Sequence, residues 1–156
     1  MSCILNIETS TSVCSVALSM DGEVLFAKAS FDGPSHAALL GVFVEEALSV
    51  LKKKGKKALD AVAVSSGPGS YTGLRIGVSV AKGLCFGFGI PLIGIHTLDI
   101  MAATACSKGD SQIVSITDDL LYCAMLDARR MEVYAAIYNA SLKPVRETKA
   151  DIVEVG

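Results

Sequence analysis

Short apolar runs separated by polar turns dominate the first part of the chain. The runs at residues 3–8, 13–20 and 23–30 have the length and composition of β-strands. Asp21 and Gly22 stand between the last two runs, and an Asp-Gly pair in such a place is a strong signal for a hairpin. We therefore expect the chain to open with a three-stranded antiparallel meander.

Farther along, apolar residues recur at the spacing of an amphipathic helix. The first helix is predicted over residues 35–54, with Ser35 as its N-cap and Gly55 just beyond its C-terminus. The elements predicted next are a strand at 60–65, a helix at about 71–87, a buried strand at 91–95 and a helix at 98–106.

The pattern restarts after a polar break at residues 108–111. The elements predicted there are a strand at 122–126, a turn at 127–130 and a strand at 132–138, followed by a polar tail with little pattern. The order β-β-β-α-β-α-β-α, followed by a new β-β, predicts an α/β protein with a mixed sheet flanked by helices. We expect a first lobe at 1–108 and a partial second lobe at 109–156.

Composition narrows the class of protein. Hydrophobic residues make up 51% of the chain, charged residues only 19%, and the mean hydropathy is +0.50, which excludes disorder and suggests an extra surface buried by a partner. The net charge of −2 disfavours nucleic-acid binding by this chain alone. No cationic leader precedes Glu8, and the charge-free stretch at 83–98 is too short to span a membrane.

Five cysteines stand singly in apolar stretches without a C-x-x-C pair, which predicts buried thiols in a reducing compartment. We therefore expect a cytoplasmic protein. The two histidines, His36 and His96, lack the spacing of metal ligands. Nothing in their placement favours a thiol peptidase, although sequence alone leaves that class open.

The loop Gly67-Pro68-Gly69-Ser70 joins a predicted strand to a predicted helix, which is where phosphate sites form. It matches neither a Walker A loop nor the dinucleotide fingerprint, so a tight turn is the simpler interpretation. In the helix that follows, Gly73, Gly77 and Ala81 share one face and allow a close approach, either by the chain's own sheet or by a partner helix.

A lysine cluster occupies residues 52–57, where five of six positions are lysine. A helix C-terminus favours cations near its last turn, so a solvated helix end is one interpretation. The alternative is a patch for RNA phosphates, which would make the chain an RNA-binding module.

Four segments carry a family resemblance. They are residues 7–11 (IETST), residues 67–77 (GPGSYTGLRIG), residues 91–98, and residues 127–130 (DARR) with 132–134 (EVY). Together they closely resemble the TsaB family of bacterial tRNA threonylcarbamoyladenosine biosynthesis proteins. Members of that family are typically longer by some tens of residues, so the second lobe is expected to be C-terminally incomplete.

The resemblance implies the actin/Hsp70/sugar-kinase-like fold, with two ribonuclease-H-like lobes, the first built on a mixed five-stranded sheet. It implies a role in making N6-threonylcarbamoyladenosine at position 37 of tRNAs that read codons beginning with A. The implied partners are the transferase TsaD, which this subunit activates, and the ATPase TsaE. A homodimer is implied when the protein is alone, with tRNA reached only through the complex and no membrane involved.

Three departures from the catalytic relatives imply a non-catalytic subunit without metal or cofactor. Where those relatives carry two metal-binding histidines, this chain has Thr97 and Met101, which are poor substitutes for imidazole. Their acidic pair is replaced by Ser12 and Val13. Their glycine-rich phosphate turn is replaced by bulky residues after Asp127. The residues that remain from a phosphate site are Glu8, Gly67, Gly69 and Ser70.

In the family the first two helices form the surface used for self-association and for TsaD. The residues expected on it here are Leu39, Phe43, Ala47, Gly73, Gly77 and Ala81. Two alternatives within the same fold are an active nucleotide-binding phosphotransferase or ATPase and a peptidase.

Overall fold

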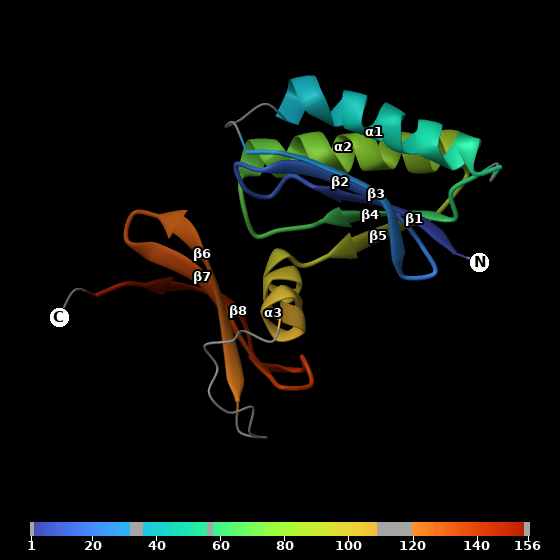
Figure 1. Ribbon diagram of the computed structural model, residues 1–156. Helices are drawn as coiled ribbons and strands as arrows, with labels where there is room; N and C mark the ends of the chain where they lie inside the picture. The colour runs from blue at the N-terminus through green and yellow to red at the C-terminus, as the bar shows by residue number, and fades with distance from the viewer. Residues whose placement is uncertain (1, 32–35, 56–57, 109–119, 155–156) are drawn as a thin grey trace. The chain divides into compact units, whose positions relative to one another are not determined.

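The computed structural model describes residues 2–31, 36–55, 58–108 and 120–154 (Figure 1). The chain divides into two compact units, Met1–Ile95 and His96–Gly156. The division falls after the last strand of the first sheet, so the third helix is grouped with the second unit and not with the first lobe predicted at 1–108. Among the described helices, none combines the length and apolar character needed to cross a membrane.

The first unit contains a five-stranded sheet in the order β3-β2-β1-β4-β5. Its strands are β1 (Cys3–Glu8), β2 (Cys14–Met20), β3 (Glu23–Ser30), β4 (Ala61–Ser65) and β5 (Leu92–Ile95). The first three pair antiparallel, as the meander predicts, while β4 pairs parallel with both β1 and β5. The sheet is therefore mixed.

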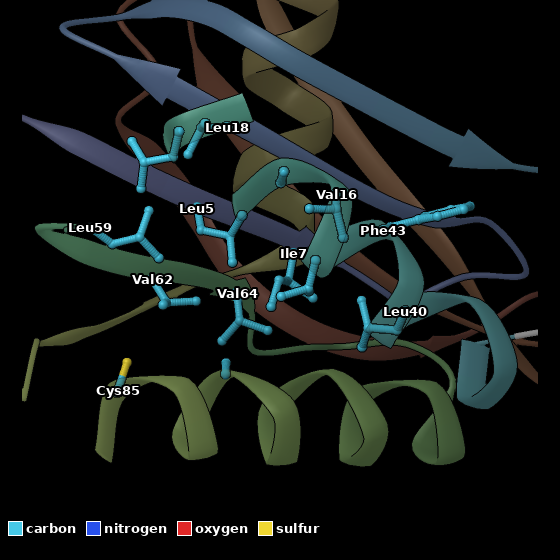
Figure 2. Close-up of a cluster of buried hydrophobic side chains, with 14 of the residues drawn as sticks. Leu5, Ile7, Val16, Leu18, Leu40, Phe43, Leu59, Val62, Val64 and Cys85 are labelled. Carbon is cyan, nitrogen blue, oxygen red and sulfur yellow. The ribbon is translucent and has the colours of Figure 1, made fainter. Parts of the chain in front are cut away.

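Helices α1 (His36–Lys53) and α2 (Tyr71–Phe88) lie on the same face of this sheet (Figure 1). The strands turn alternate aliphatic side chains toward them, and Figure 2 shows Leu5, Val16 and Val62 among these. Leu40, Phe43 and Cys85 complete the cluster from the helices. Burial of this apolar face, at roughly 25 cal/mol per Å² removed from water, is the main source of the unit's stability.

The helix ends follow the sequence signals where the structure describes them. Ser70 is the N-cap of α2, and its Oγ accepts a hydrogen bond from the Gly73 amide. Gly89 ends α2 in the left-handed conformation. Gly55 does the same after α1, donating its N–H to the Lys52 carbonyl at 3.0 Å. The predicted N-cap of α1, Ser35, lies outside the described residues.

The prediction of a buried strand at residues 91–95 is wrong in one respect. Strand β5 forms there, but it is exposed along its whole length. The reason is its position: it pairs with β4 alone among the described strands, at the edge of the sheet. Leu92, Ile93 and Ile95 each leave more than a third of their surface exposed, from 36% to 38%. By contrast β4, paired on both sides, is buried throughout.

The second unit packs α3 (Thr97–Lys108) against an antiparallel sheet in the order β6-β7-β8. Its strands are β6 (Leu121–Arg129), β7 (Glu132–Asn139) and β8 (Pro144–Ile152). A small core forms between helix and sheet from Leu98, Ala102, Ala124, Ala136 and Tyr138. The chain's polar tail, where little pattern was expected, contains β8.

The cysteine prediction holds for three of five thiols. Cys3, Cys14 and Cys85 are buried in the first unit, and burial raises the pKa of the Cys14 thiol above its usual value. Cys106 is half-buried. The prediction is wrong for Cys123, which is exposed because it lies on the outward side of the alternation along β6.

Two hairpins in the fold differ in their turn chemistry. Asp21 and Gly22 join β2 to β3 with φ of 50° and 88°, and positive φ at both residues is the signature of a type I′ turn. Arg130 and Met131 join β6 to β7 with φ of 57° and 62°, although neither is a residue that favours positive φ. This turn begins later than the predicted turn at 127–130.

Met131→Gly is therefore expected to stabilise the protein by about 0.5–1 kcal/mol, because glycine adopts positive φ without steric cost but adds entropy to the unfolded chain. Urea denaturation measures the change. The matched reverse variant is Gly22→Met, whose added Cβ meets no atom of the described part of the chain within 4 Å. It should destabilise by a similar amount, and equal stability of both variants and the wild type would contradict the backbone argument.

Candidate functional site

The turn after β1 is the point where the expected phosphate-loop residues meet. The Glu8 carboxylate accepts a hydrogen bond from the Ser10 amide at 2.6 Å. The Ser10 carbonyl in turn accepts the Ser70 N–H at 2.6 Å, so the loop before α2 is tied to this turn. Gly69 packs directly against Ser10, since a Cβ added to Gly69 would lie 2.3 Å from the Ser10 carbonyl oxygen. A Cβ added to Gly67 would lie 3.5 Å from the Leu74 side chain, and no other atom of the described residues would be within 4 Å.

These contacts occupy two of the amide groups that a phosphate at this helix end could use. A helix N-terminus binds anions through N–H groups that have no partner within the helix. Here the Ser70 amide is bonded to Ser10, and the Gly73 amide is bonded to the Ser70 hydroxyl at 3.3 Å. The arrangement therefore gives the Gly67–Ser70 loop a role in holding β1, β4 and α2 together.

The small-residue face of α2 makes its close approach inside the chain. A Cβ on Gly73 would lie 2.1 Å from the Thr9 carbonyl oxygen, and one on Gly77 would lie 2.2 Å from Thr9 Oγ1. Ala81 is also buried, in the core beneath the helix. Of the two explanations for this face, the structure supports packing against the chain's own sheet.

The residues expected on the partner surface are consequently placed in the chain's own core. Gly73, Gly77 and Ala81 are buried on α2, Phe43 and Ala47 are buried on α1, and Leu39 packs partly buried against the same cluster. Their helical spacing identified the inward face of each helix correctly. A surface for another protein on these helices has to come from the neighbouring outward residues.

A groove of about 480 Å³ lies along α2, and the first turn of α1 contributes Ala37 to its lining. It is lined by the side chains of Ala37, Tyr71, Arg75, Ile76 and Ser79, with others. The Arg75 guanidinium lies over the Tyr71 ring, 5.5 Å from its centroid. Val42 on α1 is 47% exposed and Tyr71 on α2 is 75% exposed, so both helices offer apolar surface to a partner.

Thr9 and Ser10 are the residues that sequence reasoning missed at this site. Both are almost fully buried, and among the described residues their hydroxyl oxygens have no hydrogen-bond partner, as is also true of Ser65 at the end of β4. Their only sequence signal is membership of the resembling segment 7–11. Nothing local indicates that the glycines of α2, more than fifty positions later, lie against them.

Thr97 and Met101, which the family resemblance sets where catalytic relatives have histidines, serve packing in this chain. Thr97 is buried at the start of α3, and Met101 packs against the core of the second unit. His36 is buried at the start of α1, whereas His96 is exposed. Across the described residues, no group of three His, Cys, Asp or Glu side chains is placed to hold a metal ion.

The lysine cluster is described only in part. Lys52, Lys53 and Lys54 are exposed at the end of α1, which fits a solvated helix end. Lys56 and Lys57 lie outside the described residues. The expectation of an RNA-contacting patch there stays a prediction.

Several known proteins are similar to this chain in sequence. The family model of TsaD, tRNA N6-adenosine threonylcarbamoyltransferase, matches residues 32–155. The TsaB proteins of Escherichia coli and Bacillus subtilis are 39% and 30% identical to this chain, each over 87% of it. The alignments cover 54% and 55% of those relatives, so the chain spans about half the length of the curated TsaB proteins it matches.

A solved structure agrees with these matches. YeaZ from Pseudomonas aeruginosa superposes with a TM-score of 0.77 at 29% identity, covering 98% of this chain and 68% of that one. The predicted fold class, an actin/Hsp70/sugar-kinase-like lobe on a mixed five-stranded sheet, is confirmed. The chain belongs to the family of TsaD, and within that family its sequence and fold resemble TsaB.

Proposed function

We propose that this chain acts as a TsaB-type subunit in the synthesis of N6-threonylcarbamoyladenosine in tRNA. The observation that carries the proposal is the resemblance to TsaB proteins over 87% of the chain. In this proposal the chain is not the catalyst, because Thr97 and Met101 stand where catalytic relatives have metal-binding histidines. Its contribution is to bind and activate a TsaD-type transferase together with a TsaE-type ATPase.

The outward side of α1 and α2 is the contact surface in this proposal. It combines the groove beside Arg75 with exposed apolar side chains, Val42 and Tyr71. No atom of the described residues lies within 4 Å of a Cβ added to Gly41, also on α1, so a partner helix can approach the backbone there. The same surface would form a homodimer when the transferase is absent, and tRNA would be reached through the assembled complex.

Light scattering on a sizing column tests the proposal, first with the chain alone and then with its own TsaD-type transferase. A dimer that exchanges into a one-to-one complex with the transferase is the expected result. A monomer that ignores the transferase would contradict the proposal for this chain.

Val42→Arg tests which surface is used. Burying a guanidinium without a carboxylate partner is costly, so we expect the affinity for the transferase to fall at least tenfold, corresponding to about 1.4 kcal/mol, with an unchanged melting temperature. The control is Val24→Arg on β3, where a valine that is 64% exposed pairs with Ser19, on the sheet face opposite the buried Leu18. Equal binding by both variants would exclude α1 as the contact.

Calorimetry with ATP and Mg²⁺ discriminates the phosphotransferase alternative. The bonded Ser70 and Gly73 amides argue against phosphate capture by the loop. Sub-millimolar binding of ATP by the chain alone would favour that alternative over an accessory role.

A further inference from the structure

The turn between β6 and β7 is built from residues that disfavour its backbone conformation. Arg129, Arg130 and Met131 have φ of 67°, 57° and 62°, and none of them is glycine, asparagine or aspartate. In the hairpin between β2 and β3, the residues with positive φ are Asp21 and Gly22, whose types tolerate that conformation. Strain of this kind persists only where the surrounding structure enforces it, and it is concentrated at functional positions.

Hydrogen bonds on both sides fix the strained turn. The Asp127 carboxylate accepts the Arg129 amide N–H at 2.7 Å. On the other side, the Met131 carbonyl accepts the Val153 N–H at 2.7 Å, which ties the turn to the segment after β8. The side chains of the turn are therefore presented from a backbone that has little freedom.

Those side chains are exposed, and the described part of the chain offers them no ionic partner. Both arginines are exposed, and Met131 is 57% exposed. Within the described residues neither Arg129 nor Arg130 forms an ion pair, whereas Arg146 on β8 binds the Asp151 carboxylate at 2.6 Å. The acidic residues nearest in sequence are Asp127, which caps the turn, and Glu132, which is half-buried at the start of β7.

We propose that this turn contacts the phosphate backbone of RNA, with Arg129 and Arg130 donating hydrogen bonds to phosphate oxygens. Guanidinium groups match phosphate geometry, and each such contact adds affinity by releasing counterions. A protein partner is the weaker candidate, because the tip of one hairpin buries far less area than a stable protein interface needs. The inference rests on the proposed function, in which the RNA is tRNA bound by the assembled complex.

The test measures tRNA affinity of the complete complex, with transferase and ATPase, as a function of salt. Arg129→Gln combined with Arg130→Gln should lower the slope of log affinity against log salt by about 1.4–1.8, since each phosphate contact contributes about 0.7–0.9. Affinity near 0.1 M salt should fall at least tenfold. The matched control is Lys143→Gln combined with Lys149→Gln, which removes the same charge from exposed positions of the same sheet unit and should leave the slope unchanged.

Met131→Gly separates charge from backbone strain, because it relaxes the turn while keeping both arginines. It should retain the wild-type slope. An unchanged slope in the double arginine variant would overturn the inference, as would an equal loss in the lysine control. Lower affinity with an unchanged slope would indicate a protein contact and also overturn it. If the wild-type complex forms but binds no tRNA, the proposed function itself fails.

Discussion

Gly73→Ala is expected to destabilise the first unit by about 3 kcal/mol or more, whereas Gly83→Ala in the same helix should stabilise it by about 1 kcal/mol. The added Cβ at Gly73 would lie 2.1 Å from the Thr9 carbonyl oxygen, a backbone atom in the turn after β1. This clash can be removed if α2 moves away from the sheet, which disrupts the packing of the helix. An added Cβ at Gly83 meets no atom of the described residues within 4 Å, so alanine contributes only its better helix propensity.

Urea denaturation of the two variants measures this contrast directly. Gly77→Ala supplies a further control, because its added Cβ would meet Thr9 Oγ1, a side-chain atom, at 2.2 Å. Thr9→Ala removes that atom and should restore part of the stability lost in Gly77→Ala. It should restore nothing in Gly73→Ala, whose clash is with the carbonyl. A Gly73→Ala protein that unfolds at the wild-type urea concentration would disprove the close approach of α2.

Tyr138→Phe should destabilise the second unit by about 2 kcal/mol at neutral pH. The Tyr138 hydroxyl, buried in the core of that unit, donates to Asp99 Oδ1 at 2.5 Å and joins β7 to α3. Hydrogen bonds to charged groups contribute about 1.5–3 kcal/mol, and the phenylalanine variant loses this one. Tyr134→Phe is the matched control on the same strand, since Tyr134 is half-buried and its hydroxyl forms no hydrogen bond among the described residues.

The same tyrosine gives stability a dependence on high pH. Burial, and then the hydrogen bond to Asp99, raise the pKa of Tyr138 above its usual value near 10. The folded protein therefore keeps the phenol protonated after the unfolded chain has begun to lose its proton. The contribution is complete below about pH 10 and declines as the pH rises beyond it. Urea titrations at pH 8 to 11 should show this decline in the wild type and a shallower one in Tyr138→Phe.

Most elements of the fold could be predicted because their signals are local. The Asp21-Gly22 turn, the period of α1 and the cap at Ser70 each depend on neighbouring residues. Strand β8 could not be found this way. Four of its nine side chains are charged and most are exposed, and its register comes from backbone pairing with β7. The exposure of β5 could not be predicted either, because a short apolar run has the same pattern whether its strand lies at the edge of a sheet or at its centre.

The candidate site was predictable in composition but not in contacts. Helical spacing grouped Gly73, Gly77 and Ala81 on one face, yet it could not choose between a partner helix and the chain's own Thr9. That choice depends on a tertiary contact between β1 and α2. The strain at Arg129–Met131 had no sequence signal either, because arginine and methionine adopt positive φ only when surrounding bonds enforce it.

The exposed edge strand β5 bears on how the purified protein should be handled. No described strand pairs with the outer edge of β5, and an open edge of apolar residues without charge or proline is a template for intermolecular β-pairing. Such pairing can add one molecule after another without limit. The aggregates therefore grow as the protein concentration rises, and the solution becomes turbid. A dimer through α1 and α2 is closed and saturates. Dilution series therefore distinguish the two kinds of self-association, and a single lysine in β5 should suppress only the open-ended kind.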